Sequence, residues 1–313
     1  MVIHQSVRRA EPPSATETIR SLNIEDVNRL PLGWYHRHDH AEIRRLVRGF
    51  PGRSVWRPDT GEFALIGPWR HRTDIVQVAE LSAQRSAAGL IEYAAAAAGH
   101  LGADLMVFLE NDERRRPSFY RSIDFDHLED VITMELAQPS ADTDLDEGLA
   151  FLSVVPDTPN YDEVRRIDDL AFPWLWRNGA IEFASYIRMP DVRVQIGLAD
   201  GRPVSYFGVT LYDDWGHLDR IAVRPEAQGQ GIGYQTLAAA SRLMARSGAS
   251  TIGLSTQGHN QQSRRLYERF GFVRRSMNDY RLYGRALTEA TIPDLLRRPP
   301  GVGTPFTGED TST

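Results

Sequence analysis

The sequence predicts an α/β protein that contains two copies of one fold in tandem, and three observations support this. The chain has 313 residues, about twice the length of an average domain. A strand-like run at 217–223 leads through a glycine-rich loop into a helix-like run that continues to Met244. A segment near residue 120 resembles one near residue 267, which indicates an internal repeat.

The repeat has a nearly constant spacing. Tyr120 matches Tyr267 and Phe125 matches Phe272, both at an offset of 147 residues, and a Gly-Ala pair recurs at an offset of 146. We therefore expect two domains joined by a polar, acidic linker. The predicted boundaries are 16–138 for the first copy, 139–149 for the linker, 150–287 for the second copy and 288–313 for a partly disordered tail.

The composition excludes several classes of function. The chain has no cysteine, which excludes disulfides, thiolate metal sites and a cysteine nucleophile. Its net charge is −6, with arginines well mixed among acids, so we expect no nucleic-acid partner and no membrane partner. No apolar run approaches the length of about 20 residues that a membrane helix needs, and the N-terminus lacks a signal-peptide pattern. A cytoplasmic location is the expectation.

The first copy follows a lead, 1–15, that has no apolar periodicity and is expected to be disordered. His36, His38 and His40 then alternate, and on one strand face they could bind a metal. The alternative, which we favour, is a polar loop that enters a helix near Ala41, because no further acid cluster completes a site. We therefore expect no metal.

Hairpin strands, an alanine-rich helix and a buried strand come next in the first copy. The hairpin strands are 63–66 and 73–78, with Gly61 and Pro68 as the expected breaks. The helix ends at a glycine, and the buried strand spans 105–109.

The second copy begins with a strand at 150–155 and a helix from Tyr161. An aromatic segment, 172–176, follows and could contact substrate or pack between domains. A second helix is expected at 181–189, and then a hairpin that turns at Asp200-Gly201.

The glycine-rich loop at 228–233 is the strongest functional signal. Its three glycines free the backbone to turn tightly, and the helix behind it directs unpaired N–H groups at a ligand on the loop. A diphosphate fits such a site. The glycine spacing does not match the dinucleotide fingerprint G-x-G-x-x-G, and no lysine follows as a P-loop requires.

This loop and a later segment together resemble the GNAT superfamily of N-acetyltransferases. The loop reads Q-x-x-G-x-G after a strand, as in the acyl-CoA pyrophosphate loop of that family. A strand at 251–256 follows, and then Asn260 opens a helix that carries Tyr267 and ends in Phe-Gly-Phe. The resemblance covers about residues 150–285 and implies mixed, mainly antiparallel sheets flanked by helices. The predicted fold class is therefore α/β with two tandem GNAT folds.

The resemblance implies acetyl-CoA as co-substrate and a set of residues that bind it. The end of the strand before the loop would pair with the pantetheine arm, and amides of the loop would bind the pyrophosphate. The expected cofactor-binding residues are Ile221, Ala222, Val223, Gln228, Gly229, Gln230, Gly231, Ile232, Gly233, Asn260 and Tyr267.

The first copy departs from this pattern. The equivalent loop is 82–87, which has no glycine and places Arg85 where the second copy has Gly231. Side chains there would stand where a diphosphate must touch the backbone. We therefore interpret the first copy as degenerate and structural, and its Tyr120 as a core or interface residue.

The resemblance also implies catalytic roles. Tyr267 would protonate the leaving thiolate, although a tyrosine in an amphipathic helix is also a common core residue. The family pattern places a base at His217, where the alternative is a bystander near a turn. Asp219, two residues on, would lie on the same strand face and orient His217 or bind a cationic acceptor. Asn260 would hold the cofactor or cap its helix.

The predicted function is transfer of an acetyl group from acetyl-CoA to a primary amine by direct attack. We expect a small-molecule acceptor rather than a protein, and a homodimer is left open. One alternative is a non-catalytic acyl-CoA-binding or sensor protein, and a narrower enzymatic alternative resembles mycothiol synthase in length and layout. A transferase that uses aminoacyl-tRNA should lack the loop and have a basic surface, and this chain has neither feature.

Overall fold

The computed structural model describes residues 19–111, 115–142, 145 and 148–298. The described residues form two compact units, a smaller one within residues 1–66 and 79–97 and a larger one within residues 67–78 and 98–313. The lead expected at 1–15, part of the linker and the end of the tail lie outside the described residues. The domain boundaries deduced from the repeat stay a prediction.

The smaller unit has an apolar core between its helices and a short antiparallel sheet. β1 pairs with β2 and β2 pairs with β3. Leu22, Val27, Ile43 and Trp56 are buried in this core. The elements are β1 (Arg20–Ser21), η1 (Ile24–Arg29), α1 (His40–Gly49), β2 (Val55–Trp56), β3 (Phe63–Trp69), β4 (Arg72–Ser82) and α2 (Ala87–His100), of which the last three continue into the larger unit.

The alternating histidines of this unit have separate partners. His38 Nδ1 lies 2.9 Å from Glu80, His40 Nε2 lies 3.2 Å from the carbonyl of Leu30, and His36 contacts a serine hydroxyl. The bond to Glu80 raises the pKa of His38 above its ordinary value. The predicted loop that enters a helix is confirmed, because α1 begins at His40. Among the described residues, no group of three or more His, Asp or Glu side chains could hold a metal ion.

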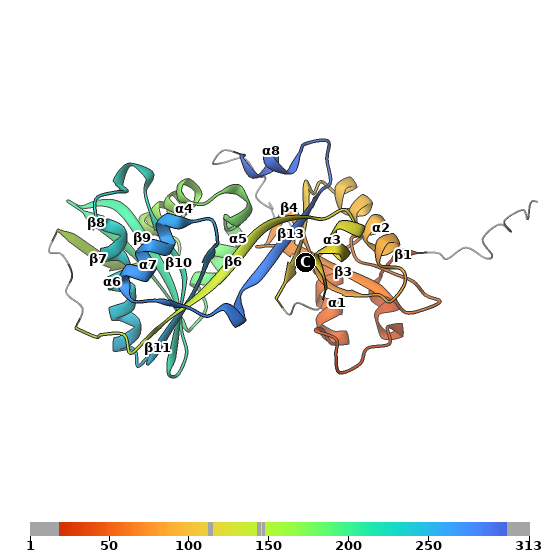
Figure 1. Cartoon of the computed structure of the whole chain (residues 1–313), viewed down its shortest axis with the longest axis horizontal. Helices are drawn as coiled ribbons and strands as arrows, with labels where there is room; N and C mark the ends of the chain where they lie inside the picture. The colour runs from red at the N-terminus through yellow and green to blue at the C-terminus, as the bar shows by residue number, and fades with distance from the viewer. Residues whose placement is uncertain (1–18, 112–114, 143–144, 146–147, 299–313) are drawn as a thin grey trace, which may run out of the picture. The chain divides into compact units, whose positions relative to one another are not determined.

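The larger unit is a mixed, mainly antiparallel sheet flanked by helices, as the sequence predicts (Figure 1). Its strands follow the order β4-β5-β13-β6-β11-β10-β9-β8-β7, with β12 beside β6. The pairs β4–β5 and β10–β11 are parallel, and the other neighbours in this order are antiparallel. The further strands are β5 (Leu105–Glu110), β6 (Asp126–Ala137), β7 (Leu149–Ser153), β8 (Val192–Ala199), β9 (Arg202–Leu211), β10 (Trp215–Val223), β11 (Thr251–Gln257), β12 (Val273–Arg274) and β13 (Tyr280–Ala286).

Helices cover both faces of the central strands in the larger unit. On β9, Phe207 and Val209 belong to the apolar cluster of α6 and α7, whereas Tyr206 belongs to the cluster of α4 and α5. Successive side chains of a strand point to opposite faces, so these two pairs of helices lie on opposite faces of the sheet. The helices are α3 (Pro117–Ser122), α4 (Pro159–Ala171), α5 (Ala180–Ile187), α6 (Ile232–Arg246), α7 (Gln261–Phe270) and α8 (Ile292–Leu296), with short 3₁₀ turns η2 (Trp174–Trp176), η3 (Pro225–Ala227) and η4 (Ser276–Asn278).

The turn between β3 and β4 differs from the prediction. Pro68 was expected to break the chain, but it lies inside β3, and the turn is formed by Arg70 and His71 with φ of 51° and 52°. Positive φ at both central residues is the geometry of a type I′ turn, which Asn and Gly usually mark. Because neither residue type is present here, this turn could not be predicted from its residues.

The tandem fold is confirmed by matching helix ends. The amide of Ala103 bonds to the carbonyl of Ala98 at 3.0 Å, and that of Ala249 bonds to Met244 at 3.1 Å, one repeat later. In the same way, Phe125 and Phe272 bond to the carbonyls of the tyrosines five residues earlier, both at 2.9 Å. Equal positions in the two copies therefore have equal backbone geometry.

The last strands of the two copies are exchanged. β13 lies between β5 and β6, and β6 lies between β13 and β11. The strand that ends the second copy thus pairs with a strand of the first copy, and the strand that ends the first copy pairs with a strand of the second (Figure 1). The contacts at the strand ends are reciprocal too, since Leu287 bonds to Asp104 at 2.9 Å and Gln138 bonds to Ser250 at 2.8 Å.

Among the described residues, no helix is both long enough and apolar enough to cross a membrane.

Candidate active site

The site is organised by strand β10, whose pairing slips by one residue at Asp219. The register with β9 shifts between Leu218 and Arg220, which is a β-bulge. Leu218 packs in the cluster of α6 and α7, whereas Ala222 packs in the cluster of α4 and α5, although an even spacing should place both on one face. The bulge therefore changes the sheet face to which the side chains after Asp219 point, next to the predicted base and its partner.

His217 and Asp219 form a hydrogen-bonded pair. His217 Nδ1 lies 2.7 Å from one carboxylate oxygen of Asp219. The other oxygen accepts hydrogen bonds from Tyr186 on α5 and from Thr210 on β9, both at 2.7 Å. Burial first, and then Asp219, raises the pKa of Tyr186, so this phenol stays a hydrogen-bond donor at neutral pH. The pair leaves His217 Nε2 as the nitrogen that can accept a proton.

A pocket of about 950 Å³ opens where β10 and β11 diverge. The two parallel strands pair from Trp215 with Thr251 to Leu218 with Leu254, and both then continue without pairing to each other. The unpaired ends line the pocket. All predicted site residues line it except Gln230 and Ile232. The lining ones are His217, Asp219, Ile221, Ala222, Val223, Gln228, Gly229, Gly231, Gly233, Asn260 and Tyr267.

The loop before α6 has the backbone geometry of an anion site. Gly229 and Gly231 have φ of 77° and 83°, a region that side chains with a Cβ rarely adopt. The amides from Gly229 to Gly233 donate no hydrogen bond to any residue that the structure describes. They lie at the N-terminus of a helix of 15 residues, where the dipole favours negative charge. Neither glycine would bring a Cβ against another atom, so their need for glycine comes from the backbone conformation.

The glutamines of the loop bond locally. The side chain of Gln228 donates to the carbonyl of Val223 at 3.1 Å, and that of Gln230 donates to Glu226 at 3.3 Å. These bonds fix the loop against the end of β10 and the turn that follows it. Gln230 and Ile232 therefore contribute to the site through their backbone, because their side chains do not line the pocket.

Helix α7 closes another side of the pocket. Asn260 caps this helix, since its side chain accepts the amide of Ser263 at 3.1 Å. Tyr267 lines the pocket with a small exposed surface of 5% and also packs edge-on against Phe272. Burial raises the pKa of Tyr267, while a hydrogen bond with Ser263 acts in the opposite direction. The phenol is therefore protonated at neutral pH, as a proton donor must be.

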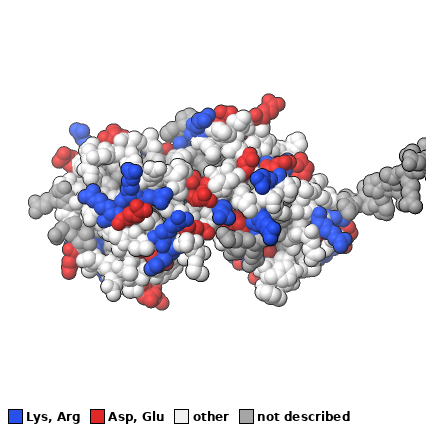
Figure 2. Space-filling model, viewed as in Figure 1, with Lys and Arg blue, Asp and Glu red and all other residues white. Residues whose placement is uncertain are grey.

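Two arginines on α7 were not singled out in the sequence. Arg265 and Arg269 are one turn apart, exposed, and both line the pocket. Arg269 also lies 5.4 Å from the ring centre of Tyr234, in the first turn of α6, so its cation is close to the loop. Figure 2 shows basic side chains gathered on the face that Figure 1 labels α7. Charged side chains on one face of a helix usually do no more than contact solvent. The glycine-rich loop beside Arg265 and Arg269 is what associates this face with the site.

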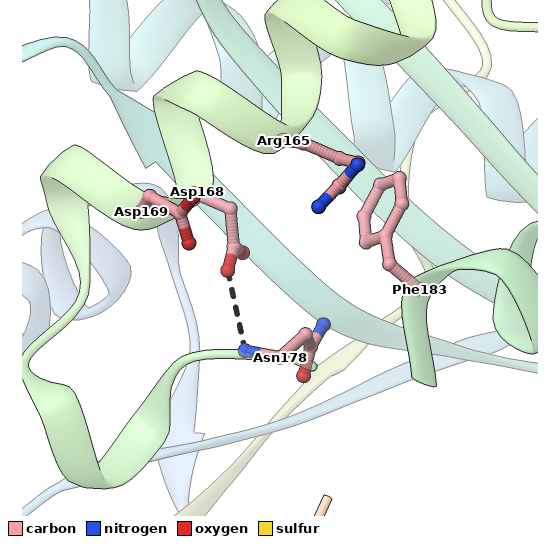
Figure 3. A pocket seen from close by; sticks show the side chains of 5 residues that line it. All are labelled: Arg165, Asp168, Asp169, Asn178 and Phe183. Carbon is pink, nitrogen blue, oxygen red and sulfur yellow. Dashed lines mark hydrogen bonds between the residues drawn. The ribbon is translucent and has the colours of Figure 1, made fainter. Parts of the chain in front are cut away.

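A buried ion pair supports the wall of the pocket. Asp168 on α4 accepts from Arg220 Nε at 3.0 Å and from the amide of Asn178 at 3.4 Å. Figure 3 shows this second bond, with the side chain of Asn178 turned away from Asp168. Arg220 also donates to the carbonyl of Trp176 at 2.8 Å and lies 3.6 Å from the ring centre of Phe172. The aromatic segment therefore packs on Arg220 and is held in one conformation.

The first copy fills its own anion site with a carboxylate. Glu62 accepts the amides of Gln84 and Arg85, at 2.5 and 2.9 Å, and the hydroxyl of Ser86. These groups lie just before helix α2, at the position that corresponds to the glycine-rich loop. A carboxylate at a helix N-terminus satisfies the free donors there. The degenerate loop thus has its anion built into the chain, a feature that sequence reasoning missed because Glu62 is about 20 residues from the loop.

Comparison with known proteins agrees with the fold described above. Residues 161–272 match the model of the acetyltransferase (GNAT) family. A Bacillus subtilis (strain 168) protein assigned as a ribosomal protein bS18-alanine N-acetyltransferase is 24% identical over 110 residues, which are 35% of this chain and 72% of that protein.

Two solved structures share the fold over most of the chain. A GCN5-related N-acetyltransferase from Sphaerobacter thermophilus matches with a TM-score of 0.59 and 16% identity, over 88% of this chain and 96% of that one. A tandem GNAT protein from the clavulanic acid biosynthesis pathway matches with a TM-score of 0.53 and 12% identity, over 88% and 99%. At these identities the likeness shows the fold alone.

The fold and the family match together define a class, that of tandem acyltransferase folds. The part of the chain at 161–272 is similar to the acetyltransferase (GNAT) family. It contains the loop, the His217–Asp219 pair and Tyr267 described above.

Proposed function

We propose that the protein transfers an acetyl group from acetyl-CoA to a primary amine. The observation that carries this proposal is the convergence of two features on one pocket: the unpaired amides from Gly229 to Gly233, and the proton-handling groups His217 and Tyr267. An anion site alone would serve a binding protein. An anion site that shares a pocket with a base and an acid suits a transferase.

The residues have separate tasks in the proposed reaction. The loop amides bind the diphosphate of the co-substrate, and Arg265 and Arg269 supply positive charge near it. His217, oriented by Asp219, takes a proton from the attacking ammonium, directly or through a water. The amine nitrogen then forms a bond with the thioester carbon, the carbon–sulfur bond breaks, and Tyr267 donates its proton to the leaving sulfur. The nitrogen loses its second proton, which returns to the Tyr267 phenolate through solvent. The products are an amide and the free thiol.

A thiol-release assay tests the proposal. The protein is incubated with acetyl-CoA and a panel of amines that includes small amines, amino acids and an alanine-initiated peptide, since the Bacillus subtilis relative is assigned to ribosomal alanine. We favour a small-molecule acceptor, because the pocket has a volume of about 950 Å³, which is of the size that small ligands occupy. Thiol release that needs an amine supports the proposal.

The same assay separates the main alternative. Tight binding of acetyl-CoA without thiol release for any amine would instead indicate an acyl-CoA sensor. The glycine-rich loop alone would be compatible with either an enzyme or a sensor. The presence of both His217 and Tyr267 in the pocket favours the enzyme.

A further inference from the structure

Arg70, one of the cations in the pocket, has no acidic partner among the residues that the structure describes. Arg70 lies at the tip of the β3–β4 hairpin and lines the pocket together with Glu182, Tyr186 and His217. Its Nη1 donates to the side chain of Asn178 at 2.8 Å, whereas its Nε is buried without any hydrogen-bond partner among the described residues. A guanidinium in a partly dry site needs an anion to offset its lost hydration.

The nearby carboxylates are already engaged. Glu182 is paired with His71, and Asp168 is paired with Arg220. Desolvation lowers the pKa of Arg70 to about 10, more than the neighbouring acids raise it, although the residue keeps some surface in the pocket. The side chain is therefore charged at neutral pH, and no carboxylate of the described residues forms an ion pair with it.

The guanidinium is held rigidly. It lies 5.7 Å from the ring centre of Trp69 and 5.4 Å from that of Trp176. The indole of Trp69 donates to the carbonyl of Leu175 at 2.7 Å, which fastens the hairpin to η2. The side chain of Asn178 accepts the hydrogen bond from Nη1 of Arg70. The backbone amide of Asn178 donates to Asp168, which fixes the position of Asn178. A guanidinium that is held in place and forms no ion pair with a described carboxylate is well suited to bind a carboxylate ligand.

Helix α5 contacts both the hairpin that carries Arg70 and the predicted base. Glu182 contacts the hairpin tip at His71, and Tyr186 contacts Asp219 beside His217. These two residues are four apart on one helix and so lie on the same helix face. Arg70 and His217 line the same pocket beside that face.

We propose that Arg70 binds the carboxylate of the acceptor, so that the acceptor is a small amino acid-like molecule with an amine and a carboxylate a few carbons apart. This inference rests on the proposed acetyl transfer and names its substrate class. A carboxylate is favoured over a phosphate, because one cation offsets one negative charge, and Asp219 and Glu182 line the same pocket.

The experiment compares matched acceptors that differ only in charge. The pairs are glycine and glycinamide, β-alanine and β-alaninamide, and γ-aminobutyrate and its amide, with 2-aminoethylphosphonate as the doubly charged probe. Wild type should prefer the carboxylate in at least one pair. Arg70→Gln should raise KM for that carboxylate by about 10- to 100-fold and leave the amide unchanged. Arg70→Lys should fall between the two, because it keeps the charge but not the fork.

Arg202→Gln is the matched control, because Arg202 is an exposed arginine on β9 that does not line the pocket. It should behave as wild type. Equal use of carboxylates and amides by wild type, or a preference that Arg70→Gln retains, would overturn the inference while acetyl transfer stands. A preference for the phosphonate would also overturn it.

Binding gives a second readout that does not depend on turnover. If no amine releases thiol, the proposed function fails, and calorimetric titration of the coenzyme A-bound protein with the same pairs then decides the role of Arg70. Carboxylate binding that Arg70→Gln abolishes supports the role, and equal binding by both proteins refutes it.

Discussion

At the scale of single residues, the site depends on pairs that sequence reasoning could anticipate only in part. The alternation of a strand predicts that His217 and Asp219 face the same way, and they are 2.7 Å apart. Tyr186 completes the arrangement from a helix 33 residues earlier. Its position in an apolar helix indicates only a core residue, so no local pattern could have identified it.

His217→Ala tests the base. The proposed base removes a proton from the attacking amine, so kcat/KM should rise with pH in the wild type and fall strongly in the variant, with a weaker dependence on pH. A pH profile of kcat/KM measures both effects. Asp219→Asn is the companion variant, expected to lower kcat with a smaller effect on acetyl-CoA binding. Identical profiles for wild type and His217→Ala would assign the proton to water or to the amine itself.

Tyr267→Phe tests the acid. Removal of the hydroxyl should lower kcat by about 10- to 1000-fold with little change in the affinity for acetyl-CoA. The ring would still pack against Phe272, so the fold should persist. Turnover numbers and calorimetric affinities measured side by side check the result. Full activity of the Tyr267→Phe enzyme would show that Tyr267 is a core residue and not the acid.

At the scale of elements, the loop and helix α6 together have the backbone geometry of an anion-binding unit. The sequence predicts this unit well, because a positive φ at glycine and free amides at a helix start are properties of a few consecutive residues. The corresponding element of the first copy shows the opposite solution. There Glu62 bonds the amides in front of α2, and a carboxylate from the chain stands where a ligand's anion would bind.

Gly231→Val tests the loop. Valine strains a backbone at φ of 83°, and the loop should lose the geometry that directs its amides outward. Affinity for acetyl-CoA should fall by about tenfold or more. The matched control is Gly201→Val, because Gly201 has a similar φ of 74° and equally open surroundings but lies in the β8–β9 turn, away from the pocket. If both variants bind acetyl-CoA as wild type does, the loop is not the binding site.

At the scale of the whole molecule, the two copies differ at the loop that precedes their first long helix after the central strands. One copy retains a free anion site, and the other has closed it with Glu62. The last strand of each copy completes the sheet of the other. The first copy is therefore required for the sheet of the second, whether or not it binds any ligand.

One acetyl-CoA should bind per chain. Calorimetric titration should give a stoichiometry of one for wild type and also for Glu62→Ala, because removal of the carboxylate does not supply the glycines that the first loop lacks. Two equivalent sites in wild type would contradict the assignment of residues 16–138 as a degenerate copy.

The fragment 150–287, the second copy as predicted from the repeat, should not fold stably by itself. It lacks β6, which pairs with both β11 and β13, so two strands would lose partners and expose unpaired edges. Thermal unfolding should be cooperative for the full chain and absent or much weakened for the fragment. Co-expression with residues 16–138 should restore it. A fragment as stable as the full chain would show that the exchange contributes little.

The sequence by itself determined the features that are encoded locally. The tandem repeat, the order of strands and helices, the glycine-rich loop, the cap at Asn260 and the His217–Asp219 pair all follow from residues close together in the chain. Such features depend on backbone conformation and strand alternation, which short segments specify largely on their own.

Only the tertiary structure decided the features that join distant segments. It exchanged β6 with β13, because strand pairing across more than 100 residues leaves no local pattern. It placed the bulge at Asp219, which the register with β9 reveals, and it brought Tyr186 to that carboxylate. It also placed Arg70 in the pocket, at a turn that its residue types do not predict. The strand exchange and the contact of Tyr186 depend on residues far apart in the chain, which meet only when the sheet forms. The bulge and the turn depend on backbone conformations that their residue types do not mark.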